Sequence, residues 1–522
     1  MSLTKVSGHL QSGATINAAD FGVSASASAS ANTTALQSAL DTLVNGGTLV
    51  ISEDISINGE IEIKYDDIKI TGDSKPLITQ TVAGLRVFFG SDISNITIEC
   101  IRIDGTDSDV AYNGVALDGD GEGAIHFTKS SGSISNIRIY DCEIFNAFTP
   151  ISVTFCTNLW VQSNVIRNYY KYGVLASRSV NFHIDNNSIL TCEYEEAGNN
   201  AYGIMATGDA NSTGDVQQRC SISNNAIDRV RLWDGIMCHD VDDIIITGNH
   251  ITDVRVGVDI SFSSAITSDI QNVIVSDNYI ELTTVDVNGG SAAIHSGISF
   301  VGDKDNNNFI ERGIISNNII KDYNKMTGYT SSGDSQGAIR VQAVKNVSVL
   351  GNVISDMGDA SSAVSPIGVF HPRENVDISN NQIAYDPNID AIVVFTSDGL
   401  THQNLSVQNN SVANQTSAGV SSARILGLNV AGSGGGATST YDGVVYSGNT
   451  SNLDTKTVRV GTGVTVNYSV SASLFSSAIG MADGITAPAT ITGIAQLYVD
   501  TADGDLKIKF GDGTVKTIVV DT

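Results

Sequence analysis

Six short segments of the sequence begin with a small residue and alternate apolar with other side chains; they start at Gly173, Gly203, Gly235, Gly257, Gly297 and Ala338. Alternate side chains of a β-strand point to opposite faces, so turning the apolar set inward places the others outside. At the outward positions and strand ends we predict a catalytic set of acids and one histidine: Asp209, Asp240, Asp259, Asp303 and His239. The predicted substrate-binding set is aromatic and basic: Tyr172, Arg178, Tyr202, Trp233 and Arg340.

This mixture of residue types suits carbohydrate chemistry, because sugar C–H faces stack on aromatic rings and hydroxyls pair with charged groups. Glycoside hydrolysis uses two carboxyl groups, ~5–5.5 Å apart for retention or ~6.5–9.5 Å apart for inversion. If the segments are neighbouring strands ~4.8 Å apart, outward carboxylates on adjacent or next-adjacent strands fall in that range. Glu195 and Glu196 lie on an insertion that could lean over the same surface.

Each of these residues also has a purely structural interpretation. Aspartates in turns commonly bond local backbone groups, and we interpret Asp234 and Asp242 as turn residues. Trp233 could pack against a neighbouring subunit, and Arg340 could form a salt bridge between strands. Three further histidines are interpreted as surface or loop residues: His126, His295 and His371.

Regular elements must position these residues, and the sequence indicates them through a repeated motif: a strand, an asparagine and a second, short strand. Its aligned asparagines lie 23 to 40 residues apart, at Asn164, Asn187, Asn225, Asn249, Asn278, Asn318, Asn352, Asn381 and Asn410. A period of ~20–50 residues is typical of a solenoid, with the excess length in lateral loops. We expect each asparagine to occupy a turn and bond its counterpart one coil above, forming a buried amide ladder.

Composition and local patterns divide the chain into four parts. Hydrophobic residues make up 41% and charged residues 16%, and segments rich in Ile and Val predict an all-β protein. The expected parts are a docking peptide (1–15), an N-terminal cap (16–47), a parallel β-helix (48–430) and a C-terminal β-rich assembly module (431–522). The cap should hold a helix over Thr33–Leu43 with Asn32 or Thr33 as its N-cap, and turns at Asp503-Gly504 and Asp512-Gly513 predict hairpins.

The net charge of −28 makes nucleic acid and anionic membranes unsuitable partners. The six cysteines show neither zinc-site spacing nor a disulfide framework, so we expect small buried thiols. The sequence predicts no membrane span and no secretory signal, hence synthesis in a reducing cytoplasm.

The segments Asn17-Ala-Ala-Asp-Phe-Gly22, Asn32-Thr-Thr-Ala-Leu-Gln-Ser-Ala-Leu40 and Gly46-Gly-Thr-Leu-Val-Ile51 resemble the N-terminal signature of pectate-lyase-like right-handed parallel β-helix proteins. With the repeats behind them, the resemblance covers residues 16–430. The usual Gly-Asp-Gly-x-x-Asp-Asp stretch is replaced by Ser24-Ala-Ser-Ala-Ser-Ala-Ser30. The short polar N-terminus and the segment Asp503 to Val515 resemble bacteriophage tailspikes within that superfamily.

The tailspike resemblance implies a homotrimer that binds and cleaves bacterial surface polysaccharide, carried on a virion tail through its N-terminal peptide. Exposed apolar side chains at Phe370, Val393 and Phe395 would fit a trimer interface. We expect a glycosidase that needs no cofactor; a lyase using β-elimination, with Ca²⁺ possible, and a non-catalytic adhesin remain alternatives. Polysaccharide, linkage, host and the placement of the groove within or between subunits are left open by the sequence.

Overall fold

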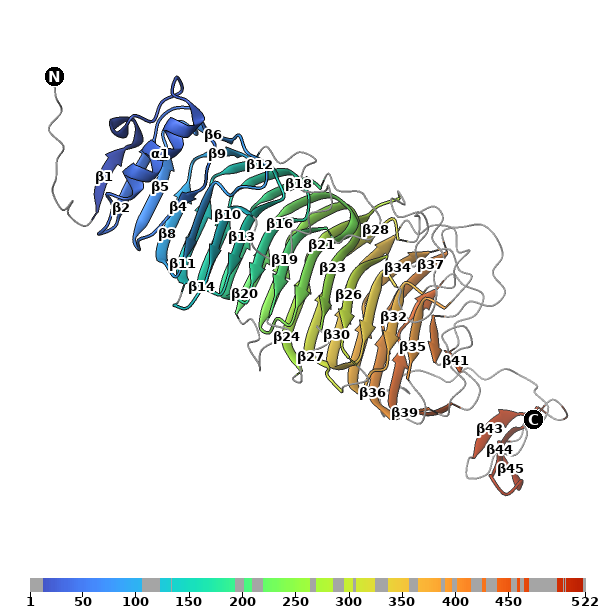
Figure 1. The fold of residues 1–522 in the computed structure, drawn as a ribbon. Coiled ribbons are helices and arrows are strands. Elements are labelled where there is room, and N and C mark those ends of the chain that lie inside the picture. The colour runs from blue at the N-terminus through green and yellow to red at the C-terminus, as the bar shows by residue number, and fades with distance from the viewer. Residues whose placement is uncertain are drawn as a thin grey trace, which may run out of the picture. The chain divides into compact units, whose positions relative to one another are not determined.

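The computed structural model describes residues 13–105, 123–132, 134–192, 201–208, 219–262, 269–284, 295–303, 307–323, 337–355, 365–385, 390–396, 401–414, 425–428, 439–451, 458–460, 464–468, 495–500, 502 and 504–519. The chain divides into two units, Met1–Tyr468 and Ser469–Thr522. The first is a stack of parallel β-coils and the second a small antiparallel sheet (Figure 1). The predicted all-β fold is therefore confirmed.

Each coil places one strand in a 16-stranded parallel sheet. Its members, in order, are β1 (Ala14–Asn17), β2 (Gly47–Ile51), β5 (Ile68–Gly72), β8 (Ser94–Glu99), β11 (Ile134–Tyr140), β14 (Cys156–Gln162), β17 (Val180–Asp185), β20 (Cys220–Ser223), β22 (Ile244–Thr247), β24 (Ile270–Ser276), β27 (Ile310–Ser316), β30 (Val344–Leu350), β33 (Glu374–Ser379), β36 (Thr401–Gln408), β39 (Thr440–Ser447) and β42 (Thr465–Tyr468). We call it the first sheet.

The second sheet combines two stacks of parallel strands, which the long strands β21 (Ala226–His239) and β23 (His250–Ser261) join by running through both. One stack contains β3 (Ile55–Ile57), β6 (Leu77–Gln80), β9 (Arg102–Asp104), β12 (Glu143–Ala147), β15 (Val165–Tyr169), β18 (Ser188–Cys192), β25 (Tyr279–Leu282), β28 (Ile319–Lys321), β31 (Val353–Ser355), β34 (Gln382–Tyr385), β37 (Ser411–Asn414) and β40 (Thr450–Ser451). The other, the groove stack, contains β4 (Ile61–Glu62), β7 (Phe88–Ser91), β10 (Gly123–Thr128), β13 (Thr149–Thr154), β16 (Tyr172–Ser177), β19 (Tyr202–Thr207), β26 (Ser296–Val301), β29 (Ile339–Gln342), β32 (Ile367–Phe370), β35 (Ile392–Phe395), β38 (Leu426–Leu428) and β41 (Val458–Val460).

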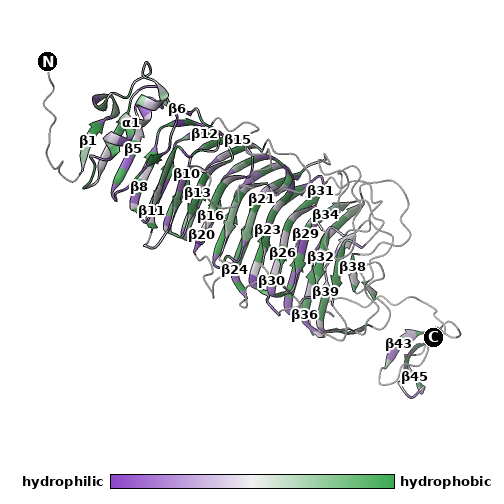
Figure 2. Ribbon diagram, in the orientation of Figure 1, coloured by the Kyte–Doolittle hydropathy of each residue, from purple (hydrophilic) through white to green (hydrophobic). Residues whose placement is uncertain are grey.

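The core is a column of inward side chains, mostly Ile, Val and Leu, that continues from coil to coil. Hydrophobic residues accordingly recur along the strands throughout the stack (Figure 2). The parallel pairing continues through β39 to β42 at Tyr468, so the coils pass the boundary near residue 430 that the sequence suggested.

The asparagine ladder forms as predicted. From Asn164 onward, each ladder amide donates its Nδ2–H to the Oδ1 of the next asparagine at 2.9–3.0 Å, and the series ends at Asn449. The ladder residues themselves are not the left-handed ones: the preceding residues, among them Asn186 and Asn224, have positive φ. The αL position therefore shapes the turn, while the ladder amide points into the core.

At the N-terminus, a 3₁₀ turn, η1 (Ala18–Phe21), precedes helix α1 (Ala29–Leu40). The predicted N-cap was wrong, since the Ser28 side chain caps the helix by accepting from the Ala31 N–H. Asn32 lies inside the helix, fully buried, and its amide donates to the carbonyls of Ser24 and Ser56. Leu36, Leu40 and Leu43 face the core as expected.

The second unit consists of β43 (Gln496–Val499), β44 (Leu506–Lys509) and β45 (Val515–Val519) in antiparallel order. Both predicted hairpins are present, and Gly504 and Gly513 take the positive φ that their turns require, although Asp503 lies outside the described residues. Five of the six cysteines are buried and all are free thiols, with Cys100 partly exposed.

Candidate functional site

The groove stack shows the strand parity that the sequence predicted. Ile204, Ile236, Val258, Ile298 and Ile339 are fully buried in the core. The register then aligns one outward row across five strands, namely Met205, Met237, Asp259, Ser299 and Arg340. A parallel row two residues later contains Thr207, His239, Ser261, Val301 and Gln342.

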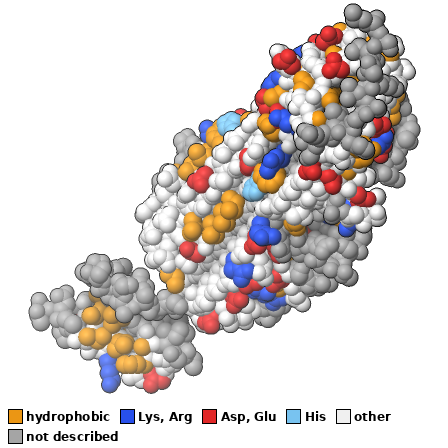
Figure 3. Space-filling model, turned by 90° about the vertical axis from the view of Figure 1, so that its left-hand side faces the viewer, with side chains coloured by type: hydrophobic (Ala, Val, Ile, Leu, Met, Phe, Trp, Pro, Cys, Tyr) orange, Lys and Arg blue, Asp and Glu red, His pale blue; other side chains and the backbone are white. Residues whose placement is uncertain are grey.

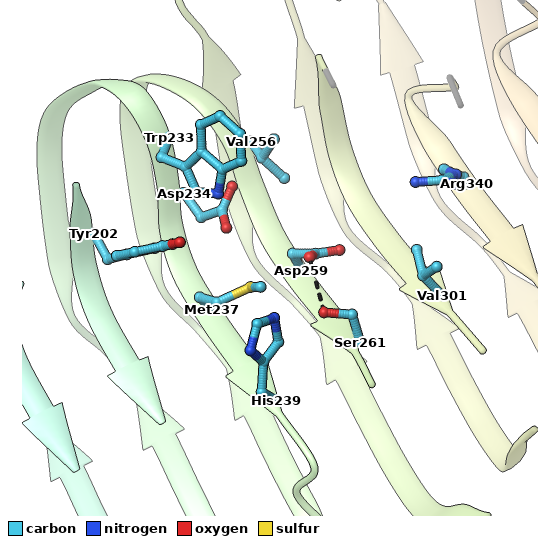
Figure 4. A pocket seen from close by; sticks show the side chains of 10 residues that line it. All are labelled: Tyr202, Trp233, Asp234, Met237, His239, Val256, Asp259, Ser261, Val301 and Arg340. Carbon is cyan, nitrogen blue, oxygen red and sulfur yellow. Dashed lines mark hydrogen bonds between the residues drawn. The ribbon is translucent and has the colours of Figure 1, made fainter. Parts of the chain in front are cut away.

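A pocket of about 360 Å³ opens over this part of the groove stack. Side chains from β19, β21, β23, β26 and β29 point into it (Figure 4). The lining consists of Tyr202, Trp233, Asp234, Met237, His239, Val256, Asp259, Ser261, Val301 and Arg340. Five of the ten predicted site residues are therefore brought together here: Tyr202, Trp233, His239, Asp259 and Arg340.

Two carboxyl groups face this pocket. Asp259 is 8% exposed, and burial raises its pKa, which the neighbouring Ser299 and Ser261 hydroxyls and the Arg340 charge partly offset. Its Oδ2 accepts a hydrogen bond from the Ser261 hydroxyl at 3.2 Å. Its Oδ1 is buried and has no hydrogen-bond partner among the described residues.

The second carboxyl group is Asp234, 2% exposed, which the sequence had suggested was a turn residue. That interpretation was wrong, because β21 extends through this position, although its register against β23 shifts between Val230 and Asp234, and the Asp234 side chain lines the pocket. Burial and then the nearby Asp259 charge raise its pKa well above the usual range, while Arg255 opposes the shift. Within the described part of the chain, the buried Asp234 Oδ2 lacks a hydrogen-bond partner.

The sequence feature that could have pointed to Asp234 as a pocket residue is its position directly before Gly235. Tyr172 and Tyr202 stand in the same relation to the glycines that begin their strands. These glycines pack closely: a Cβ on Gly235 would lie 2.7 Å from the Ile251 side chain. The residue before each glycine thus lies where the chain enters the groove stack.

Tyr202 and Trp233 contribute aromatic side chains to the pocket lining, and a buried cation, Arg255, lies next to Trp233. Tyr202 stacks on Tyr172 of the preceding coil with ring centroids 5.6 Å apart. The Arg255 guanidinium is 5.2 Å from the Trp233 ring centroid and donates to the Leu232 carbonyl at 3.0 Å. Arg255 was not predicted from the sequence, because its alternating pattern does not reveal a buried cation.

His239 and Arg340 line different edges of the pocket, on β21 and β29 (Figure 4). Burial lowers the pKa of His239 to about 4, so its imidazole is neutral near pH 7. Arg340 is 7% exposed and donates to the Gln342 side chain at 2.5 Å. A neutral imidazole and a cation therefore share the pocket with the two carboxyl groups.

Among the described residues, the other predicted site residues do not line this pocket: Tyr172, Arg178, Asp240 and Asp303. Asp240 is a fully buried turn residue with φ of 58°, and Asp303 forms a backbone bridge with Asn308. Arg178 lies over the Phe155 ring. Asp209, Glu195 and Glu196 fall outside the described residues.

Two other expectations need correction. Three histidines were expected on the surface or in loops; His295 and His371 do lie outside strands and His126 lies in β10, but all three are buried, with exposures of 4% or less. The apolar residues expected to be exposed at a trimer interface are 4–8% exposed in the single chain: Phe370, Val393 and Phe395. The His371 ring packs edge-on against Phe395, and the His295 ring is nearly parallel to that of Tyr323, so these side chains are buried against other rings of the same chain.

The described residues contain no cluster of three His, Cys, Asp or Glu side chains that could hold a metal ion. Nor do they include a helix of the length and apolar character needed to cross a bilayer. One face of the molecule shows small groups of hydrophobic side chains among polar atoms, with acidic and basic side chains interspersed (Figure 3).

Several solved structures are similar to this chain at low identity. The pre-mature bacteriophage phi29 gene product 12 is 14% identical with a TM-score of 0.53, and the match covers 90% of this chain and 58% of that chain. Tailspike protein 3 of bacteriophage CBA120 is 13% identical, with a TM-score of 0.44 and coverage of 97% and 69%. The A-module of the Azotobacter vinelandii mannuronan C-5 epimerase AlgE4 is also 13% identical, with a TM-score of 0.39 and coverage of 87% and 100%.

At these identities the likeness extends to the fold alone. A sequence comparison with curated proteins finds no match. The family model described as the right-handed β-helix region matches residues 54–265 and 123–312. Together with the parallel coils that the structure shows, this match identifies the fold as a right-handed parallel β-helix.

Proposed function

We propose that this protein binds a bacterial surface polysaccharide and cleaves its glycosidic bonds by hydrolysis in the pocket over β19, β21, β23, β26 and β29. The observation that carries the proposal is the pair Asp234 and Asp259. Both are buried in one pocket, both have raised pKa values, and each has a buried oxygen without a hydrogen-bond partner among the described residues. Buried polar atoms are normally satisfied, so unpaired ones in a pocket favour a role toward a ligand.

The two carboxyl groups have unlike environments, which assigns them different roles. Asp234 keeps its proton more strongly, because burial and the Asp259 charge both oppose its ionisation. It is therefore the proposed general acid that protonates the leaving oxygen. Asp259 is the group that ionises first, since Arg340, Ser261 and Ser299 favour its carboxylate. It acts as the nucleophile or as the base that activates water.

Tyr202 and Trp233 supply the apolar surface on which sugar rings stack, and Arg340 supplies donors for hydroxyl or carboxylate oxygens. Of the four aspartates predicted from the sequence, the proposed pair keeps Asp259 and adds Asp234, while Asp240 and Asp303 lie outside the pocket and Asp209 lies outside the described residues. No metal or cofactor is part of this mechanism.

A lyase is the second candidate, favoured by a specific observation. His239 is neutral near pH 7 and lines the same pocket as Arg340. A neutral imidazole could remove the proton next to a uronate carboxylate while the guanidinium neutralises that carboxylate. The pair of raised carboxyl pKa values has no role in that reaction, so we rank hydrolysis first.

The test is digestion of a panel of capsular and O-antigen polysaccharides, recording new reducing ends and the absorbance of unsaturated uronates. Reducing ends without that absorbance support hydrolysis, and both signals together support a lyase. Asp234→Asn and Asp259→Asn should each lower the rate about 10²–10⁴-fold, the usual contribution of acid–base groups. Asp303→Asn is the matched control, because Asp303 lies outside the pocket. Binding without either product would favour an adhesin.

We further propose a homotrimeric tailspike on a phage virion, docked through the N-terminal peptide (1–15). The support is the resemblance of the segment Asp503 to Val515 to tailspikes. Residues 1–12 lie outside the described residues. Light scattering of the full chain should give three times the monomer mass of 54.7 kDa. The purified protein should also block infection by the phage that carries it, and failure of either test rejects the corresponding part.

A further inference from the structure

A second pocket lies on a different face of the coils, over the first sheet. Its volume is about 390 Å³ and its lining consists of Arg138, Tyr140, Trp160, Gln162 and Ser163. The strands involved are β11 and β14, which are hydrogen-bonded neighbours. Their Leu159 and Val161 side chains are fully buried, so the alternating Trp160 and Gln162 point away from the core.

The register builds two adjacent rows across this face. Arg138, Trp160 and His183 are aligned on three successive strands, and Tyr140, Gln162 and Asp185 form the row beside them. Trp160 and His183 are nearly parallel, with ring centroids 6.2 Å apart and an angle of 16°. The pocket therefore has an aromatic row on one side and a hydrogen-bonding row on the other.

Hydrogen bonds fix the far end of this arrangement. The His183 Nδ1 lies 2.8 Å from the Ser221 hydroxyl. Asp185 accepts from the Ser223 hydroxyl at 2.6 Å and from the Gln162 amide at 3.3 Å. The imidazole beside Trp160 and the amide beside the pocket are thus held in place before a ligand arrives, which lowers the entropic cost of binding.

Arg138 is the distinctive group of the site. Its guanidinium carbon lies 4.7 Å from the Trp160 ring centroid, and the side chain is exposed. The described residues give it no carboxylate partner within salt-bridge distance, unlike Arg86, Arg167 and Arg231, which pair with acids. In a chain with a net charge of −28, a cation left facing an open pocket is complementary to an anionic group.

We infer that this pocket is a second saccharide-binding site, separate from the cleavage pocket, that takes an acidic sugar unit of a polymer. The sugar carboxylate pairs with Arg138, and the sugar ring contacts Trp160. Tyr140, Gln162 and Ser163 provide hydroxyl and amide groups for sugar hydroxyls. The inference rests on the proposed function only for the class of ligand, since it involves no residue of the first pocket.

The test uses the tryptophans themselves, because the chain has two, Trp160 and Trp233. In the full-length Trp233→Phe variant, Trp160 is the sole reporter, and in Trp160→Phe it is Trp233. Each variant also carries Asp259→Asn so that added ligand stays intact. Both are titrated with oligogalacturonates as the acidic probe and with maltooligosaccharides of equal length as the neutral probe, following emission.

We expect oligogalacturonates, and not the neutral oligomers, to change the emission of Trp160. Adding Arg138→Gln should raise the Kd at least about tenfold, since it removes a charge-assisted pair. Arg312→Gln, an exposed arginine of β27 in the same sheet, is the matched control and should leave the Kd unchanged. Circular dichroism of each variant separates a binding loss from misfolding.

An unchanged Trp160 emission, an equal response to both probes, or an unchanged Kd in Arg138→Gln would each overturn the inference. Cleavage assays report on the first pocket alone, so failure of the hydrolase proposal and failure of this site are distinguishable. Emission changes confined to Trp233 would place all saccharide binding in the first pocket.

Discussion

The asparagine ladder allows a stability prediction whose size follows from counted contacts. Asn278 is 1% exposed, and its Nδ2 donates to the Ile246 carbonyl at 3.0 Å and to Asn318 Oδ1 at 2.9 Å. Its Oδ1 accepts from both the backbone N–H and the Nδ2 of Asn249, at 3.0 and 2.9 Å. The Asn278 Nδ2 also donates to the Ser276 carbonyl at 3.0 Å, so Asn278→Ala removes five hydrogen bonds and leaves the backbone of this position in place.

The largest cost falls on the backbone N–H of Asn249, because the substitution removes its hydrogen-bond acceptor, the Asn278 Oδ1. An unsatisfied buried donor costs ~1–3 kcal/mol, and each of the other lost bonds contributes ~0.5–1.5 kcal/mol. The Oδ1 of Asn318 loses the side-chain donor but still accepts a hydrogen bond from the backbone N–H of residue 278 at 3.0 Å. We therefore expect a loss of at least about 2 kcal/mol in the local free energy of unfolding.

Native-state hydrogen exchange measured by mass spectrometry is the appropriate assay, because coils of a solenoid open locally. Since ~1.4 kcal/mol corresponds to a factor of ten, the Asn249 amide should exchange at least about 30-fold faster in Asn278→Ala. Ser276→Ala, which removes one hydroxyl contact in the same turn, is the control and should change exchange little. Equal exchange at Asn249 in the wild type and Asn278→Ala would refute the claim that the ladder stabilises the coils.

Three further predictions concern the pocket, acid stability and thiols. Asp259→Asn should abolish most cleavage while retaining polysaccharide binding in affinity electrophoresis; lost binding would instead indicate a structural role. Burial lowers the pKa of His295 to about 4 from an ordinary 6.5. The folding stability that depends on its neutral imidazole is therefore fully present above pH 6.5 and is lost as the pH falls through 4. The full loss is about 3 kcal/mol. The drop in Tm between pH 7 and 5 should therefore shrink in His295→Gln and persist in His250→Gln, an exposed control. Burial raises the pKa of three thiols to about 12, so iodoacetamide at pH 8 should spare them in the native chain and label them after unfolding: Cys142, Cys156 and Cys220.

Much of the architecture could be predicted because it depends on local repetition. Inward and outward positions alternate along a strand, so Val258 and Asp259 could be assigned to opposite faces from their order alone. The ladder asparagines could be aligned for the same reason, since each coil repeats the same turn. The helix start was harder, because Ser28 and Asn32 are both suitable caps and the contacts of the surrounding cap decided between them.

The candidate site was predictable only where strand parity governs it. Tyr202, His239 and Arg340 reach the pocket as expected, while Asp240 turns into a buried bend and Asp303 pairs with Asn308. These two aspartates sit at strand ends, where a single change of backbone conformation redirects the side chain. Parity carries no information at such positions.

The sequence by itself determined that the chain coils, which strand faces are apolar, and that a ladder of amides joins the turns, because each of these follows from a short pattern repeated many times. Only the tertiary structure decided that β21 continues through Asp234 and that Asp234 and Asp259 share one pocket beside the buried Arg255. The tertiary structure also placed the Arg138 guanidinium over the Trp160 ring on the first sheet. These features depend on the register between strands of different coils, which brings together residues far apart in the sequence and which no single repeat encodes.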